Sequence, residues 1–153
     1  MTGRGSVMAV PRDRPYGNAN FVVDLGDGAE GPAAGFAEVV FPVFAITRPR
    51  EGEPSPHEQP GATPVASERL ILKRGVNGAL NLYAWWHRAR TGKAPQRRTV
   101  QVHLLAEDHA TVVFSWRFRH ARPVSLSYSP LRALDGGALI ETLEIEFDRV
   151  EVA

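Results

Sequence analysis

The sequence predicts a mostly β domain, a small β-barrel or sandwich with one flanking α-helix. Apolar residues recur at every second position within several short segments, which is typical of strands that bury one face. Only one stretch, in the middle of the chain, has apolar residues at helical spacing. Segments rich in glycine and proline separate these stretches, and this order favours a sandwich or barrel over an alternating βαβ sheet.

Composition narrows the class of protein further. The chain has 153 residues, of which 43% are hydrophobic and 23% charged, so one globular domain can bury a core without a metal or disulfide. The absence of cysteine excludes disulfides, thiolate nucleophiles and cysteine-based zinc or iron–sulfur sites. A formal charge of +1 argues against a polycation that coats nucleic acid or membranes.

Targeting segments are not indicated by the hydropathy pattern. No apolar run reaches the roughly 18 residues of a membrane span, and the first residues lack an apolar stretch of signal-peptide length. We therefore expect no membrane anchor, no signal peptide and assembly in the cytoplasm.

The N-terminal third is predicted to hold an arm and two strands. Residues 1–18 mix Gly, Pro, Arg and Asn without periodicity, so we expect a flexible arm before a single domain of residues 19–153. Apolar residues alternate over 20–25, which predicts a strand. A second, largely apolar strand is expected over 36–46, and Pro42 within it places that strand at an edge or bulge.

The middle of the chain is predicted to hold a long loop, a short strand and the helix. Residues 47–68 contain five prolines, and loops of this length are usually functional or become ordered on a partner, which we expect here. Residues 70–75 read as a strand. The helix follows and is expected to end at Gly92, because helical spacing connects Leu80, Tyr83, Ala84 and His87.

After Pro95 the period returns to two, and the rest of the chain is predicted to be β. The expected strands cover residues 99–105, 111–119, 123–128 and 138–152. On the last of these, Leu143 and Ile145 are expected to face inward, and Glu144 and Glu146 outward.

Three glycines match a nucleotide-binding spacing without its context. Gly26, Gly28 and Gly31 fit G-x-G-x-x-G, in which a backbone turn approaches a pyrophosphate at a helix start. Pro32 follows at once and no helical pattern opens there. The sequence therefore predicts a hairpin turn and no bound cofactor.

One stretch combines histidines and carboxylates, the residue types of metal and acid–base sites. His103 and His109 flank Glu107 and Asp108, but His103 lies in a strand pattern and the others read as a polar hairpin tip. Nucleophile-elbow, zinc-protease and phosphate-loop motifs are absent from the sequence. We therefore expect no enzyme, no catalytic residues and no metal site.

The aromatic residues suggest an alternative function, a monomeric nucleic-acid-binding β-barrel module. Stacking on single strands would use Tyr83, Trp85, Trp86 and Trp116 beside the cations Arg88, Arg90, Arg97 and Arg98. The favoured interpretation is structural. Adjacent Trp85 and Trp86 point to different sides of a helix, so one can anchor it in the core while the other packs elsewhere, and the pattern leaves open which one is buried.

Charge is segregated along the chain although it balances in total. A basic stretch surrounds the helix end, and the last predicted strand is acidic, with Glu141, Glu144, Glu146, Asp148 and Glu151. Opposite patches on one small domain suit head-to-tail self-association. The candidate inter-subunit contacts are Arg97, Arg98, Glu141, Glu144 and Glu146.

A set of motifs in fixed order extends over nearly the whole chain. They are D-R-P-Y at 13–16, G-F-x-E-V at 35–39, L-K-R-G at 72–75, L-Y-x-W-W at 82–86, R-R at 97–98 and I-E-x-L-E at 140–144. In this order they resemble the tail-tube proteins of contractile-tailed phages and the inner-tube subunits of phage-derived contractile injection systems.

The resemblance implies a fold similar to the haemolysin-coregulated ring proteins, assembling into hexameric rings that stack into a hollow tube. A contracting sheath would drive this tube through a target envelope. The implied partners are the chain itself, a sheath protein, baseplate or hub proteins, tube-terminating proteins and a lumenal cargo of effector protein or DNA. The chain would be a component of a phage tail or of an extracellular or cytoplasmic injection particle, without an active site.

Overall fold

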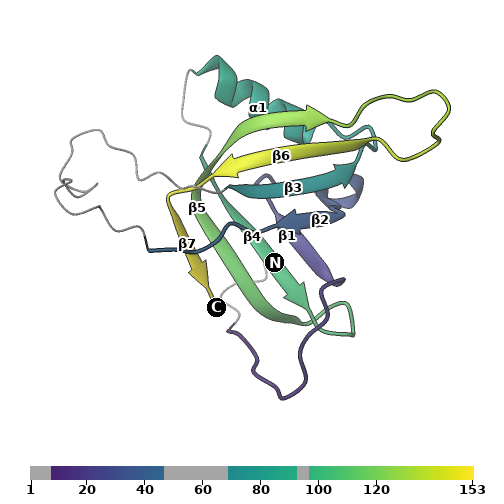
Figure 1. The fold of residues 1–153 in the computed structure, drawn as a ribbon. Coiled ribbons are helices and arrows are strands. Elements are labelled where there is room, and N and C mark those ends of the chain that lie inside the picture. Colours follow the sequence, from purple (N-terminus) through teal and green to yellow (C-terminus); the bar gives the residue numbers. More distant parts are fainter. Residues whose placement is uncertain (1–7, 47–68, 93–96) are drawn as a thin grey trace.

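The computed structural model describes residues 8–46, 69–92 and 97–153. Within these ranges the chain forms seven strands, one α-helix and one 3-10 helix, in an order that confirms the mostly β prediction (Figure 1). The elements are β1 (Phe21–Asp24), η1 (Gly31–Ala34), β2 (Glu38–Val40), β3 (Leu70–Gly75), α1 (Asn81–Thr91), β4 (Arg98–Leu105), β5 (Val112–Tyr128), β6 (Ile140–Glu146) and β7 (Arg149–Val152).

All the strand pairs are antiparallel, and the strand order is β1-β4-β5-β6-β3-β2 with β7 also on β5. The long strand β5 takes part in two layers, because its first half pairs with β4 and β7 and its second half with β6. It bends near His120, which has a φ of 53°, and its register to β6 shifts between Pro123 and Ser125. Figure 1 shows the result, in which β2, β3 and β6 run across the direction of β1 and β4.

The core lies between these layers and the helix. Alternate residues of β3 and β6 are fully buried, and α1 and the β4–β5 layer contribute the rest. Burying an aliphatic or aromatic side chain of this size contributes about 1.5–3 kcal/mol. The fully buried apolar residues are Leu70, Leu72, Leu82, Trp85, Val100, Phe118, Ala121, Leu143 and Ile145. The predicted inward orientation of Leu143 and Ile145 is thereby confirmed.

The single α-helix forms where the spacing predicted it. It ends at Gly92, whose φ of 72° is accessible to glycine and whose N–H donates to the Arg88 carbonyl at 3.3 Å. Two cations, Arg88 and Arg90, lie in its last turn, where they interact favourably with the helix dipole. Trp85 is the buried tryptophan of the pair, and Trp86 is half-buried.

Three predicted element boundaries were wrong. The strand expected over 36–46 is only Glu38–Val40, at the sheet edge beside β3, and Pro42 lies beyond it. The strands expected over 111–119 and 123–128 are one bent strand. The strand expected over 138–152 is two, β6 and β7, because the partner strand β5 changes direction between them.

The turn after β1 was also predicted wrongly as a hairpin. Gly26, Gly28 and Gly31 all have positive φ, as a tight turn requires. However, β1 pairs with β4 and β2 pairs with β3, so the turn connects two layers and leads into the short helix η1.

The predicted arm and the Pro-rich loop fall partly or wholly outside the described ranges. Residues 1–7 and the predicted loop, 47–68, are not among the described residues. Residues 8–18 contain neither helix nor strand, but Val10 N–H donates to the Val113 carbonyl at 2.9 Å. Arg12 donates to both carboxylate oxygens of Glu107, at 3.0 and 2.6 Å. None of the helices in the described part of the chain is long and apolar enough to cross a membrane.

Candidate assembly surfaces

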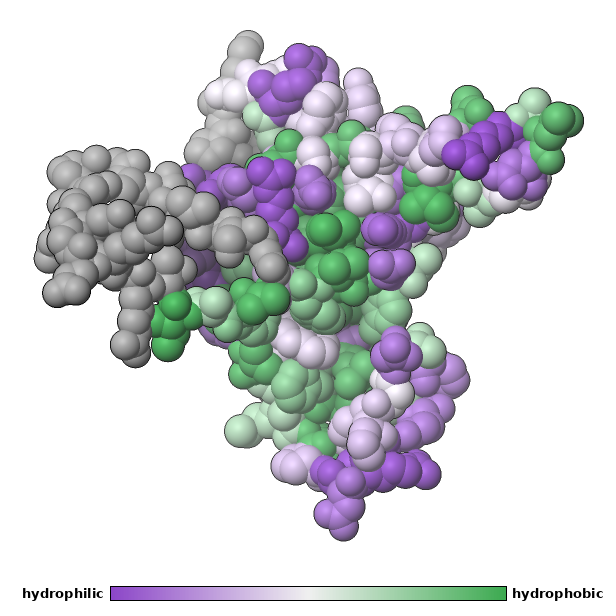
Figure 2. Space-filling view, in the orientation of Figure 1, coloured by the Kyte–Doolittle hydropathy of each residue, from purple (hydrophilic) through white to green (hydrophobic). Residues whose placement is uncertain are grey.

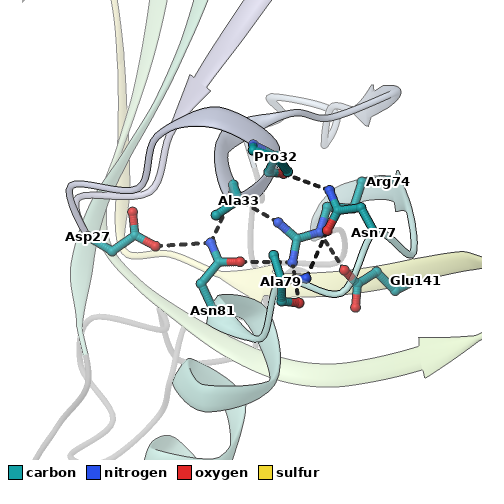
Figure 3. A network of polar contacts seen from close by, with 8 residues as sticks. All are labelled: Asp27, Pro32, Ala33, Arg74, Asn77, Ala79, Asn81 and Glu141. Atoms are coloured by element: carbon teal, nitrogen blue, oxygen red, sulfur yellow. Dashed lines mark hydrogen bonds and ion pairs between the residues drawn. The ribbon is translucent and has the colours of Figure 1, made fainter.

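Arg74 is a buried arginine whose hydrogen bonds connect β3 with β6 and with the start of α1 (Figure 3). Arg74 on β3 is almost fully buried and donates through Nε to the carboxylate of Glu141, its direct neighbour on β6. Its Nη1 donates to the Ala33 carbonyl at 2.9 Å. Its Nη2 donates to the Ala79 carbonyl at 3.2 Å and to Asn81 Oδ1 at 2.8 Å.

Asn81 and Asn77 extend this network to the turn after β1. The Asn81 amide donates to Asp27 Oδ2 at 3.2 Å and to the Ala33 carbonyl at 2.9 Å. The Asn77 amide donates to the Pro32 carbonyl at 2.7 Å. Three segments that are distant in sequence therefore meet at one point, and the start of α1 is positioned relative to both β3 and β6 (Figure 3).

The acidic strand predicted as a contact surface divides into two parts. Glu141 is buried with Arg74 and belongs to the core network. Glu144 and Glu146 face outward and are about one third exposed. The Glu144 carboxylate accepts from Ser125 Oγ at 2.7 Å and from Arg69 at 3.2 Å.

The two predicted arginines also differ. Arg97 is half-exposed and lies 3.8 Å from the Asp148 carboxylate. Arg98 packs with its guanidinium 4.6 Å from the centre of the Trp85 ring. Its buried Nη1 has no hydrogen-bond partner among the described residues, and burial lowers the pKa of its guanidinium. Arg97, Glu144 and Glu146 are therefore accessible at the surface, whereas Arg98 is partly buried against Trp85 and Glu141 is buried in the core.

Asp148, at the junction of β6 and β7, gathers several cations. It accepts from Arg122 Nη1 at 3.1 Å and from His120 Nδ1 at 3.2 Å, in addition to the contact with Arg97. The hydrogen bond from Arg122 is the main cause that lowers the pKa of Asp148. Both signs of charge are thus present at this end of the molecule.

The aromatic residues do not form a common stacking surface. Trp85 is in the core, and Trp116 packs against Phe41 and Phe114, with ring centres 4.5 and 4.9 Å apart. Tyr83 and Trp86 pair on the helix surface, with ring centres 6.1 Å apart. Binding of single-stranded nucleic acid by stacking would need these rings on one exposed surface. Trp85 is instead in the core, and Trp116 and Trp86 lie on different elements.

The histidine stretch has a structural explanation. His103 is buried on β4, where Nδ1 shares a hydrogen bond of 2.7 Å with Ser115 Oγ on β5. Glu107 and Asp108 lie in the exposed turn, and His109 has a φ of 60° there. Across 8–46, 69–92 and 97–153 no group of three His, Asp or Glu side chains is placed to hold a metal ion.

Two exposed apolar surfaces were missed by sequence reasoning. The first, which we call the apolar strip, is residues 40–46, in which Phe44 is 51% and Ile46 85% exposed. The second, which we call the finger, is residues 129–139 between β5 and β6, in which Leu131 is 85% exposed and Leu134 fully exposed. Both appear as hydrophobic patches at opposite sides of Figure 2. Exposed apolar groups gathered in this way mark contact surfaces.

Comparison with solved structures shows that this fold is shared with proteins of injection particles. The chain aligns with a structure titled anti-feeding prophage baseplate, 6-fold symmetrised, with a TM-score of 0.67, 24% identity and coverage of 93% of this chain and 97% of that one. It aligns with the PVC sheath–tube complex of an extracellular contractile injection system with a TM-score of 0.66, 19% identity and 91% coverage of both chains. Hcp1 from Flavobacterium johnsoniae matches with a TM-score of 0.56, 13% identity and coverage of 87% and 94%.

No curated protein matches the chain in sequence. A family model does: the model described as T4-like virus tail tube protein gp19 matches residues 17–151. This range includes every helix and nearly every strand residue of the fold described above. The chain therefore belongs to the T4-like virus tail tube protein family.

Proposed function

We propose that this tail tube protein is the inner-tube subunit of a contractile injection system, in which hexameric rings of the chain stack into a hollow tube. The observation that carries the proposal is the family match over residues 17–151. A chain in the sheath–tube complex of an extracellular contractile injection system has the same fold, which is consistent with this role.

The surfaces of the monomer support self-assembly. Of the strands described, β1 and β2 are at the two ends of the strand order and each pairs on one side only. Open edges of this kind are template surfaces for further chains. The apolar strip and the finger add exposed apolar area, and Arg97, Glu144 and Glu146 add exposed charge.

The proposed partners follow from the role as an inner-tube subunit. Neighbouring copies would form the ring and the stack, while a sheath protein would surround the tube and baseplate and terminating proteins would bind its ends. The lumen would hold an effector protein or DNA as cargo. The role is structural and non-enzymatic, because its chemistry consists of contacts between subunits.

Negative-stain electron microscopy of the purified chain, alone and co-expressed with its sheath and baseplate proteins, tests the proposal. We expect six-fold rings or hollow stacks in at least the co-expressed sample. Dispersed monomers in both samples would contradict it, and steeply salt-dependent binding of single-stranded nucleic acid would then favour the alternative module.

A further inference from the structure

The finger is a projection whose two leucines, Leu131 and Leu134, are among the most exposed apolar side chains of the described residues. Its base is closed by two hydrogen bonds of 2.9 Å, from Ser129 N–H to the Ile140 carbonyl and from Ile140 N–H to Ser129 Oγ. Its tip turns at Gly136, which has a φ of 67°. Figure 1 shows the loop extending away from the body of the domain, so Leu131 and Leu134 are held in solvent by a defined backbone.

The finger also curves around an open hollow of about 350 Å³. It is lined only by the finger itself, by residues 129–133 and 135–139. A cavity of about 150 Å³ accommodates a benzene ring, so this hollow has room for at least one large apolar side chain. The hollow opens to solvent, so a side chain from another molecule can enter it.

The apolar strip leaves the same sheet at the other end. Gly75 is opposite Ile140, so the finger begins at the Gly75 end of β3. Val40 is opposite Ile71, so the strip continues beyond the start of β3. Figure 1 shows the strip and the finger on opposite sides of the domain, which excludes a contact between them within one copy.

We propose that the finger of one copy docks on the apolar strip of the next copy, with Phe44 or Ile46 of the strip filling the hollow and Leu131 and Leu134 packing beside it. This inference rests on the proposed function, since it specifies one contact of the self-assembling tube. The contact is heterologous, so repeated use of it closes a ring or extends a stack.

A second copy fits this surface better than a different protein for two reasons. One chain carries both halves of an apolar contact at opposite ends, which only a copy of the same chain can satisfy repeatedly. The charges are also compatible. Arg132 and Asp135 of the finger take part in no ion pair with the described residues, and Arg97 and Asp148 provide both signs at the end from which the strip departs.

Cross-linking tests the contact directly, because the chain has no cysteine and engineered thiols would be the only ones. The double variant Leu134→Cys/Ile46→Cys, treated with a short bis-maleimide under assembly conditions, is expected to give a ladder of covalent oligomers on a denaturing gel. The matched control is Leu134→Cys/Leu80→Cys, since Leu80 is also an exposed leucine but precedes α1, at the finger's end of the sheet. The control is expected to give no ladder.

A second measurement uses Leu131→Ser/Leu134→Ser, which removes the apolar groups of the finger without touching the core. We expect the melting temperature of the monomer to be unchanged and the concentration needed for assembly to rise about tenfold or more. Leu80→Ser is the control and should assemble as the parent chain does.

The outcomes separate this inference from the proposed function. If the parent chain forms rings or tubes while the serine variant assembles equally well and no ladder appears, the finger contact is wrong and the function stands. Cross-links from the finger to the sheath protein alone would also overturn it. If the parent chain forms no assembly even with sheath and baseplate, both proposals fall.

Discussion

Arg74 and Glu141 lie directly opposite each other on β3 and β6, and neither side chain is more than 5% exposed. The same guanidinium also donates to Ala33, Ala79 and Asn81, so one buried cation is neutralised and each of its three nitrogens donates at least one hydrogen bond. A charged pair of this kind contributes chiefly through specificity, because desolvation offsets much of the attraction. Here it sets where α1 and the turn after β1 meet the sheet.

Removing only the cation is expected to be strongly destabilising. Arg74→Met leaves Glu141 buried without its partner, and an uncompensated buried charge costs about 3–5 kcal/mol of the free energy of unfolding. Urea denaturation followed by circular dichroism measures the loss. The double variant Arg74→Met/Glu141→Leu should recover a large part of it. Arg69→Met, which breaks an exposed pair with Glu144, is the control and should cost no more than about 1 kcal/mol.

The two adjacent tryptophans are expected to differ in their effect on folding. Trp85→Ala removes a side chain that is fully buried and should cost about 3–5 kcal/mol of stability. Trp86→Ala should cost clearly less, because that ring is half-buried and pairs with the exposed side chains of Tyr83 and Arg90. Thermal denaturation of the two variants checks this order, and equal losses would contradict it.

The attachment of residues 8–18 to the turn between β4 and β5, through Arg12 and Glu107, is expected to weaken at acid pH. The hydrogen bonds from Arg12 are the main cause that lowers the pKa of Glu107 from 4.5 to about 2. A carboxyl whose pKa is lowered on folding stabilises the folded state above its unfolded pKa, and this stabilisation is lost as pH falls from about 4.5 to about 2. A carboxyl NMR titration should give Glu107 a midpoint near 2, and Arg12→Gln should return it toward 4.5.

Asp108, in the same turn, provides the internal control for that titration. Its pKa is lowered from 3.8 to about 2 chiefly by the Thr111 hydroxyl, and Arg12 is not among the causes. Its midpoint should therefore stay unchanged in Arg12→Gln. A shift of both midpoints would show that the whole turn had rearranged.

Charge reversal on the outer face of β6 is expected to separate folding from assembly. Glu144→Lys loses contacts to Ser125 and Arg69 at a partly exposed site, so the stability of the monomer should change by no more than about 1 kcal/mol. Stacking should be disturbed, seen as shorter tubes in electron micrographs. Glu30→Lys makes the same change of charge at an exposed position outside the sheet. Tubes of parent length and salt tolerance in Glu144→Lys would contradict a role of this surface in assembly.

Local pattern was sufficient for several elements of this fold. The alternation in residues 70–75 predicted β3 with the bounds that the structure has, and helical spacing with Gly92 predicted α1. These signals are local because each strand or helix buries one face, which repeats with its own period. The order of motifs was also enough to indicate the tail tube family.

The alternation of residues could not reveal where β5 bends. A bend needs only one residue in a left-handed conformation and a register shift, and neither changes the period of the flanking residues. For the same reason the division of the last segment into β6 and β7 became visible only from their shared partner strand.

The sequence by itself determined the fold class, the helix, the core faces of the strands and the family. Tertiary structure alone decided which of the charged and apolar residues named below are buried and which are exposed, because burial depends on which other segments pack beside a residue. It put Glu141 into the core with Arg74, left Glu144 outside three residues later, and buried Trp85 against Arg98. It also left Leu134 and Ile46 in solvent at opposite ends of one sheet, since no segment among the described residues covers either side chain.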